Sequence, residues 1–158
     1  MGRNPRGRLR RSRRLIAVDT NILIYAHRPD AEWHKPAQAC IKSLAEGRAA
    51  WALPWPCVHE FLSVATNPRI HKLPTPMAIA IQQLEMWIAS PSCRLIGEEL
   101  NHLQTLSVLV LSAKSHGPAI HDARIASICL SHGVSELWTA DRDFMKFPAL
   151  KAVNPLVG

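Results

Sequence analysis

The stretch LIAVDTNILI (residues 15–24) indicates the architecture of the whole chain. Its first four residues form an apolar run that predicts a short strand buried on both faces. Asp19 follows directly, and it either caps a helix that begins at Thr20 or faces a ligand at the end of the strand. An acid directly after a buried strand is found where an open parallel sheet of an α/β protein binds its ligand.

Strand-like and helix-like segments alternate along the rest of the chain, as expected for an α/β protein. Further strands are predicted at residues 49–53, 93–96 and 136–139, with a weak fifth strand at 152–153. Helices are predicted at residues 32–46, 54–66, 76–89, 98–115 and 119–132, and Thr75 is expected to cap the third of these. Because neither a repeat nor a linker divides the sequence, we expect one domain with a central, mostly parallel sheet of four to five short strands flanked by helices.

Length and composition are those of a globular protein. The 158 residues suffice for one hydrophobic core, and 47% hydrophobic with 20% charged residues exclude a mostly disordered chain. No apolar run approaches the roughly 18 residues of a membrane span, and the short apolar run before Asp19 is too brief for a secretion signal. The four cysteines contain no CxxC pair, so we expect buried free thiols in a protein of the cytoplasm.

The net charge of +7 comes entirely from the first 14 residues. Seven of the 19 Lys and Arg residues lie there without any acid, whereas the other twelve are balanced by twelve Asp and Glu residues. Residues 1–14 are therefore predicted to be a disordered basic tail, and residues 15–158 the folded domain. The tail is either an arm that contacts nucleic-acid phosphates or sequence added by an upstream start codon, and both interpretations stay open.

Four acidic residues occupy positions that are unusual for surface charges. Asp19 and Asp141 follow predicted strands, at the edge where parallel sheets bind ligands. Asp122 lies on the inward side of its helix, in the first turn, and Glu60 lies along an apolar stripe. Helix capping explains an acid taken alone, but four acids together would repel one another and so require a cation. Since no Lys or Arg occupies a matching position, we expect Mg²⁺, with Mn²⁺ as an alternative ion.

Four short motifs resemble, in their order, those of the PIN-domain nucleases, and most closely the VapC-type toxins of bacterial toxin–antitoxin pairs. The motifs are VDTNIL (18–23), EFLSV (60–64), HDA (121–123) and TADRDF (139–144), and the match spans about residues 15–147. Each motif alone is weak, whereas the ordered set is fairly specific. The resemblance implies a single PIN-like α/β domain.

The resemblance also implies roles for five acids. Carried over by position, Asp19, Glu60, Asp122 and Asp141 correspond to the acidic quartet of the family, and Asp143 to the additional acid of many members. Asp19 and Asp122 would be the principal metal ligands, with Asp141 binding directly or through water.

Three further residues and several partners follow from the same resemblance. Thr139 and Asn21 would orient the acidic cluster, and Arg69, in the stretch Asn67-Pro68-Arg69, would contact RNA. The family implies an RNA substrate, a small antitoxin that blocks the acidic site, and a homodimer. The Arg-rich tail departs from the family pattern.

Carboxylate-held Mg²⁺ lowers the pKa of a bound water and stabilises charge on a phosphodiester during hydrolysis. In-line attack on RNA would leave a 5′-phosphate and a 3′-hydroxyl. Glu60 or Asp141 would accept the proton of the water, and either one ion or two would suit four or five acids. We therefore predict a metal-dependent endoribonuclease, the toxin of a toxin–antitoxin pair.

The main alternative is a non-catalytic RNA-binding module that uses the Arg-rich tail. Five tryptophans could stack on bases, but tryptophans within apolar runs are more typical of a core or an interface. The eight histidines are scattered and give no spacing that favours metal-independent acid–base cleavage. Deleting the tail would separate the two main hypotheses, because only the binding module should then lose its function.

Overall fold

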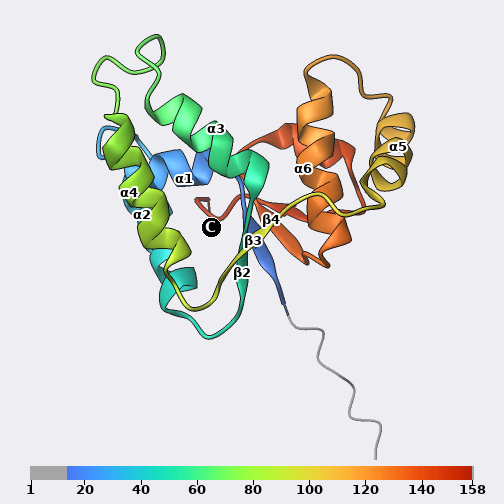
Figure 1. Cartoon of the computed structure of the whole chain (residues 1–158), viewed down its shortest axis with the longest axis horizontal. Coiled ribbons are helices and arrows are strands. Elements are labelled where there is room, and N and C mark those ends of the chain that lie inside the picture. The colour runs from blue at the N-terminus through green and yellow to red at the C-terminus, as the bar shows by residue number, and fades with distance from the viewer. Residues whose placement is uncertain (1–13, 158) are drawn as a thin grey trace, which may run out of the picture.

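A five-stranded parallel sheet forms the centre of the protein (Figure 1). The computed structural model describes residues 14–157, and the strands lie in the order β3-β2-β1-β4-β5. The strands are β1 (Ile16–Val18), β2 (Trp51–Pro54), β3 (Cys93–Ile96), β4 (Glu136–Trp138) and β5 (Ala152–Val153), and every neighbouring pair is parallel. The predicted α/β class and all five predicted strands are confirmed.

Helices cover both faces of this sheet. Within residues 14–157 they are α1 (Thr20–His27), α2 (His34–Glu46), α3 (Trp55–Ala65), α4 (Met77–Ile88), α5 (His102–Ala113), α6 (Ala119–Ser131) and the 3-10 helix η1 (Arg142–Lys146). In Figure 1, α1, α2 and α4 lie on one side of the sheet, and α5 and α6 lie on the other. None of these helices has the length and hydropathy of a membrane-spanning segment.

Burial of both sheet faces explains the unbroken apolar run before Asp19. Ala17 and Leu137 belong to the hydrophobic cluster beneath α6, whereas Val18 and Trp51 belong to the cluster beneath α1. All four side chains are fully buried, so polar residues at alternate positions of these strands would have no access to water.

Helix α5 is shorter than the predicted helix 98–115. Glu98 forms an ion pair with Arg124 of α6, and Glu99 Oε1 lies 3.2 Å from Nε2 of His132, directly after α6. These side-chain contacts hold residues 98–101 in a connection between β3 and α5, and the helix begins only at His102.

The predicted Thr75 cap of α4 is wrong. Pro76 occupies the capping position, and no side chain there accepts a hydrogen bond from the helix. The Thr75 hydroxyl instead contacts His27 Nε2 at 3.0 Å and accepts a hydrogen bond from Arg28 Nη1 at 3.3 Å. Thr75 therefore fixes the loop before α4 to the end of α1 rather than starting α4.

The predictions of a basic tail and of buried cysteines are each tested only in part or confirmed only in part. Residues 1–13 of the predicted basic tail lie outside the described residues, but the last tail residue, Arg14, forms an ion pair with Glu136. All four cysteines are free, as predicted, yet only Cys57 and Cys129 are buried. The other two thiols are partly exposed, because their segments lie at the margin of the second hydrophobic cluster.

Candidate active site

The carboxyl ends of β1 and β4 bring together residues that are 120 positions apart in the sequence. The two strands pair in parallel, with Val18 opposite Trp138, and the Asp19 backbone N–H donates to the Trp138 carbonyl at 3.0 Å. The side chains of Asp19 and Thr139 therefore meet at the carboxyl-terminal edge of the sheet, where the sequence placed Asp19 and Asp141.

Asp19 is almost fully buried, and four groups hold its carboxylate. Its Oδ1 accepts hydrogen bonds from the Thr20 backbone N–H at 2.8 Å and from the Cys57 thiol at 3.5 Å. Its Oδ2 accepts from the Thr139 hydroxyl at 2.7 Å and from the Asn21 side-chain amide at 3.3 Å. The bond to Thr20 makes Asp19 the N-cap of α1, so capping and a place in the acidic cluster are combined in one residue.

Thr139 joins the two strand ends. Its buried hydroxyl, besides donating to Asp19, accepts hydrogen bonds from the Asn21 amide at 3.2 Å and from the Asp141 backbone N–H at 3.0 Å. The Asn21 side-chain oxygen accepts from the Ala140 N–H at 3.1 Å. The two residues predicted to support the site therefore lie within the hydrogen-bond network that orients Asp19.

Glu60 approaches the same place from α3. The Thr20 hydroxyl donates to Glu60 Oε2 at 3.2 Å. The expectation that this carboxylate is buried on an apolar stripe is wrong, because Glu60 is exposed. Of its apolar neighbours on α3, Cys57 is buried in the core, whereas Val64, one turn further along, lines the acidic pocket, so the stripe borders both.

The four acids of the predicted quartet line one pocket of about 340 Å³: Asp19, Glu60, Asp122 and Asp141. The tightest group of carboxylates is formed by Asp122, Asp141 and Asp143, which each place one oxygen within 4.8 Å of the others. Asp143 is exposed, and its backbone N–H donates to Asp141 Oδ1 at 2.9 Å. The structure thus brings all five predicted acids to the same edge of the sheet.

The pocket concentrates negative charge that no cation of the described chain neutralises. Within residues 14–157, none of the five acids takes part in an ion pair. Burial, followed by the nearby carboxylates of Asp141, Asp19, Asp143 and Glu60, raises the pKa of Asp122 to about 6. Burial also raises the pKa of Asp19, against the lowering effect of its hydrogen bonds. Such raised pKa values are typical of carboxylates that are arranged to hold a cation.

Replacing Asp122 by Asn is expected to stabilise the metal-free protein. Its raised pKa means that the folded state holds this proton more tightly, so the stabilisation present at low pH is lost as the pH rises through about 6. Asp122→Asn removes the charge, and after solvent screening we expect a gain of about 1–2 kcal/mol at pH 7.5, or about 2–6 °C in Tm. Thermal denaturation in EDTA at pH 7.5 and pH 5 measures this gain, which should shrink at the lower pH. Glu85→Gln, which removes an exposed charge on α4, is the control and should leave Tm unchanged.

The loop between α3 and α4 supplies lining residues that the sequence did not indicate. Ile70 and His71 lie in the acidic pocket with Tyr25 of α1. The loop is held by buried Arg28, whose Nη2 donates to the Leu73 carbonyl at 3.0 Å and whose guanidinium pairs with Asp30. The sequence signal was weak, since a single arginine after a helix is most often exposed.

Arg69 lies on this loop but not among the residues that line the pocket. Its side chain is exposed, and its backbone N–H donates to Asn67 Oδ1 at 2.9 Å in a local turn. His59 and His121, which are adjacent to two of the acids in sequence, are exposed and also do not line the pocket. The predicted RNA contact of Arg69 therefore stays a prediction.

Comparisons with known proteins identify the family of this chain. The family model of the PIN domain matches residues 16–150. Ribonuclease VapC43 of Mycobacterium tuberculosis is 30% identical over 144 residues, which cover 91% of this chain and 97% of the relative. Ribonuclease VapC48 of the same organism is 25% identical over 140 residues, covering 89% of this chain and 97% of the relative. The chain therefore belongs to the PIN-domain family, and its resemblance to the VapC ribonucleases is confirmed.

Solved structures share the same fold. FitAcB from Neisseria gonorrhoeae superposes with a TM-score of 0.66 at 21% identity, over 90% of this chain and 99% of that chain. VapBC2 from Rickettsia felis, bound to a DNA fragment from its promoter, gives a TM-score of 0.64 at 16% identity, over 88% and 97% of the two chains. At these identities the similarity supports the parallel sheet and its helices, and the chemistry depends on the residues described above.

Proposed function

We propose that this protein is a Mg²⁺-dependent endoribonuclease that acts as the toxin of a toxin–antitoxin pair. The observation that carries the proposal is the pocket in which Asp19, Glu60, Asp122 and Asp141 converge without a neutralising cation among residues 14–157. The ribonuclease names of VapC43 and VapC48 support RNA as the substrate.

The donor set of the pocket fits a hard divalent cation. Every candidate ligand is a carboxylate oxygen, which suits Mg²⁺ or Mn²⁺ and not a metal that prefers nitrogen or sulfur. Asp19, Asp122 and Asp141 would hold the ion, with Asp143 close enough to add a further oxygen. Such an ion, when bound, supplies charge stabilisation for a phosphodiester and lowers the pKa of a water.

Residues around the pocket would accept a proton and orient the metal ligands. Glu60 is exposed, and its one side-chain hydrogen bond within residues 14–157 is to Thr20, which leaves its second oxygen to accept a proton from an attacking water. Asp141 is the other candidate, although its Oδ1 accepts the Asp143 N–H. Thr139 and Asn21 keep the Asp19 carboxylate in one orientation while these transfers occur.

Removal of the metal tests the proposal directly. Purified protein is expected to cleave total cellular RNA in Mg²⁺, to lose this cleavage in EDTA, and to regain it when excess Mg²⁺ is added. End-group analysis of the products should give 5′-phosphates and 3′-hydroxyls. Cleavage that persists in EDTA would contradict the proposal and indicate metal-independent cleavage by histidines. RNA binding without cleavage would indicate a non-catalytic RNA-binding module.

Binding of Mg²⁺ is expected to weaken below about pH 6. The ion ligates the charged carboxylate, so a proton on Asp122, whose pKa is raised to about 6, competes with it. Affinity should change little between pH 7 and 8 and should fall by up to about tenfold per pH unit below pH 6. Isothermal titration calorimetry across this range, in two buffers of different ionisation enthalpy, measures both the affinity and the protons released. An affinity that stays constant down to pH 5 would exclude Asp122 as a ligand.

We further propose an antitoxin partner, a homodimer and a cytoplasmic location. The FitAcB and VapBC2 structures share this fold and support a partner protein. A cationic side chain of that partner would form ion pairs with the carboxylates of the acidic pocket. For the homodimer, the outer face of α5 exposes Leu103, Val108 and Leu111, which an identical subunit would cover.

A further inference from the structure

A second cavity lies at the amino-terminal edge of the sheet, opposite to the acidic pocket. Its volume is about 610 Å³, and its lining comes from the segments directly before β1, β2, β3 and β4, together with the start of β3. Strands of three to four residues, with a rise of about 3.3 Å per residue, separate the two edges by roughly 10–13 Å of sheet. The acidic site uses no residue of this cavity.

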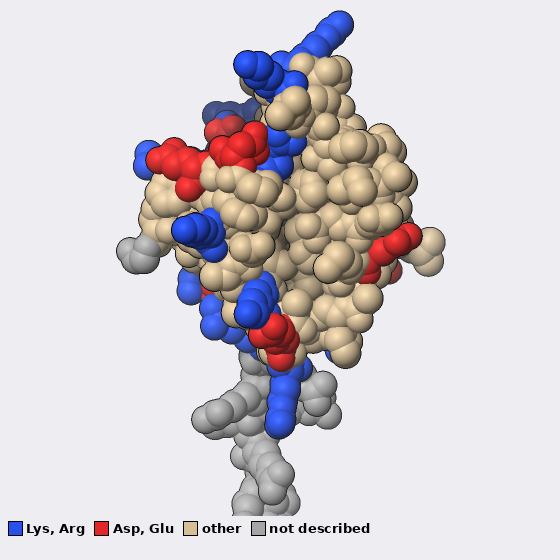
Figure 2. Space-filling view, turned by 90° about the vertical axis from the view of Figure 1, so that its left-hand side faces the viewer, with Lys and Arg blue, Asp and Glu red and all other residues tan. Residues whose placement is uncertain are grey.

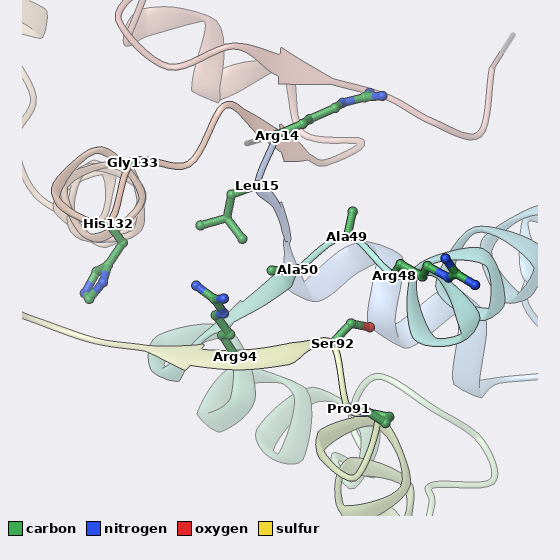
Figure 3. A pocket seen from close by; sticks show the side chains of 10 residues that line it. All are labelled: Arg14, Leu15, Arg48, Ala49, Ala50, Pro91, Ser92, Arg94, His132 and Gly133. Atoms are coloured by element: carbon green, nitrogen blue, oxygen red, sulfur yellow. The ribbon is translucent and has the colours of Figure 1, made fainter. Parts of the chain in front are cut away.

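The cavity is lined by three arginines and by no acidic residue. Figure 3 shows Arg94 reaching from β3 into the space beside Leu15 and Ala50, whereas Arg14 and Arg48 lie at its margin. Within residues 14–157, neither Arg48 nor Arg94 forms an ion pair, and both are exposed. Their guanidinium groups are therefore available to an anion from outside the chain.

Arg14 has a different role, because it is already paired. Its guanidinium donates to both carboxylate oxygens of the nearly buried Glu136, at 3.1 and 3.0 Å, and this contact lowers the pKa of Glu136. The ion pair fixes Arg14 at the margin of the cavity, where the described chain begins. Six more arginines lie among the thirteen preceding residues of the sequence. Figure 2 shows Lys and Arg side chains on the lower part of the face that it presents, with an acidic side chain among them, and further Lys and Arg side chains at the upper end.

We propose that this cavity binds a phosphate of the RNA backbone, so that a substrate contacts the protein at both edges of the sheet. The inference rests on the proposed function, which takes RNA as the substrate. The acidic pocket repels a polyanion, and a basic cavity elsewhere on the domain supplies attraction that the active site lacks. The planar guanidinium of Arg94 matches a phosphate through two parallel hydrogen bonds.

RNA suits this cavity better than a membrane surface does. A membrane-binding surface needs exposed large apolar side chains beside its cations, and none of those exposed in the described chain lines this cavity. The cavity is also concave, and an RNA strand can enter a concave site more easily than the flat headgroup layer of a membrane can.

The test compares two variants that lose the same charge. Arg48→Gln/Arg94→Gln changes the cavity, and Lys35→Gln/Lys114→Gln removes two exposed charges elsewhere. Binding of the full-length variants to a labelled single-stranded RNA of about 40 nucleotides is measured by fluorescence anisotropy in EDTA, at several salt concentrations. The cavity variant should bind about tenfold more weakly, and the slope of log affinity against log salt should fall by about 0.7, which corresponds to one phosphate contact on a single strand. The control should stay within twofold of the wild type.

Several results would overturn the inference. Equal losses in the cavity variant and the lysine control would mean that only total charge matters. Loss of binding to phosphatidylserine vesicles or to polyglutamate, with RNA binding unchanged, would assign the cavity to a membrane or to an acidic protein. Unchanged melting temperatures ensure that neither variant is misfolded.

The binding assay needs neither metal nor cleavage, so it separates this inference from the proposed function. If the wild type cleaves no RNA but the cavity variant binds RNA more weakly than the wild type, the endoribonuclease proposal fails and the cavity inference stands. If the wild type cleaves RNA and the cavity variant binds RNA as tightly as the wild type, the endoribonuclease proposal stands and the cavity inference fails. When both proposals are correct, the cavity variant keeps its kcat, while its KM for the long RNA rises with Kd.

Discussion

Asp19→Asn is expected to abolish Mg²⁺-dependent RNA cleavage while leaving the fold intact. The substitution removes the most buried carboxylate of the pocket, and several kcal/mol of transition-state stabilisation depend on the ion it would hold. We expect a loss of about 1,000-fold in kcat/KM, equivalent to about 4 kcal/mol. Asparagine is as good an N-cap as aspartate, so α1 should still begin at Thr20.

The measurement is cleavage of a defined RNA by the wild type and by Asp19→Asn at equal concentrations, together with thermal denaturation of both proteins. Glu85→Gln serves as the control, because it also removes one negative charge but lies exposed on α4. Asp19→Ala adds a second comparison, since it loses the cap as well and should cost about 1 kcal/mol of stability. Full cleavage by a folded Asp19→Asn protein would remove Asp19 from the active site.

Thr139→Val is expected to have the second-largest effect, on both stability and activity. Valine has nearly the same shape as threonine but cannot donate to Asp19 Oδ2 or accept from the Asp141 N–H and the Asn21 amide. Leaving these buried groups without a partner should destabilise the protein by about 1–3 kcal/mol. Loss of the group that orients a metal ligand should lower metal affinity or activity by about 10–100-fold.

Thr139 is a positioning residue, so its test needs a readout that a merely structural role would not change. Activity is measured well below the melting temperature of the variant, and kcat is separated from the Mg²⁺ concentration that gives half-maximal rate. Thr139→Ser restores the hydroxyl and should recover most of the activity. A Thr139→Val protein whose melting temperature falls while its Mg²⁺ dependence is unchanged would show that the hydroxyl only supports folding.

The acidic pocket explains why the individual acids were hard to interpret from sequence. Asp19 caps α1 with one oxygen and accepts a hydrogen bond from Thr139 with the other, so the two interpretations of this residue, helix cap and site residue, are both correct. Glu60 was expected to lie along an apolar stripe because its helical neighbours are apolar, and the structure places it, exposed, in the lining of the acidic pocket. Periodicity along a helix predicts which residues share a face, but it does not tell whether that face meets the core or a pocket.

The basic cavity shows what charge counting misses. The sequence balances its bases and acids beyond residue 14, which suggests a neutral domain. In the structure, Arg48 and Arg94, which are 46 positions apart, line one cavity, while the five acids of the candidate site lie at the opposite edge of the sheet. The domain is therefore neutral in total, but its acidic pocket and its arginine-lined cavity lie at opposite edges of the sheet.

The sequence by itself determined the five strands, the helices α2 to α6, the α/β class and the acids at the ends of β1 and β4, whereas η1 was not predicted and α1 was considered only as the helix that Asp19 would cap. These features depend on local patterns: apolar runs, breaks at Gly and Pro, and a carboxylate directly after a strand. Only the tertiary structure decided which groups orient Asp19, how exposed Glu60 is, and where the arginines gather. These properties arise from contacts between residues that are far apart in the sequence, and parallel pairing of β1 with β4 is the physical cause that brings the most important of them together.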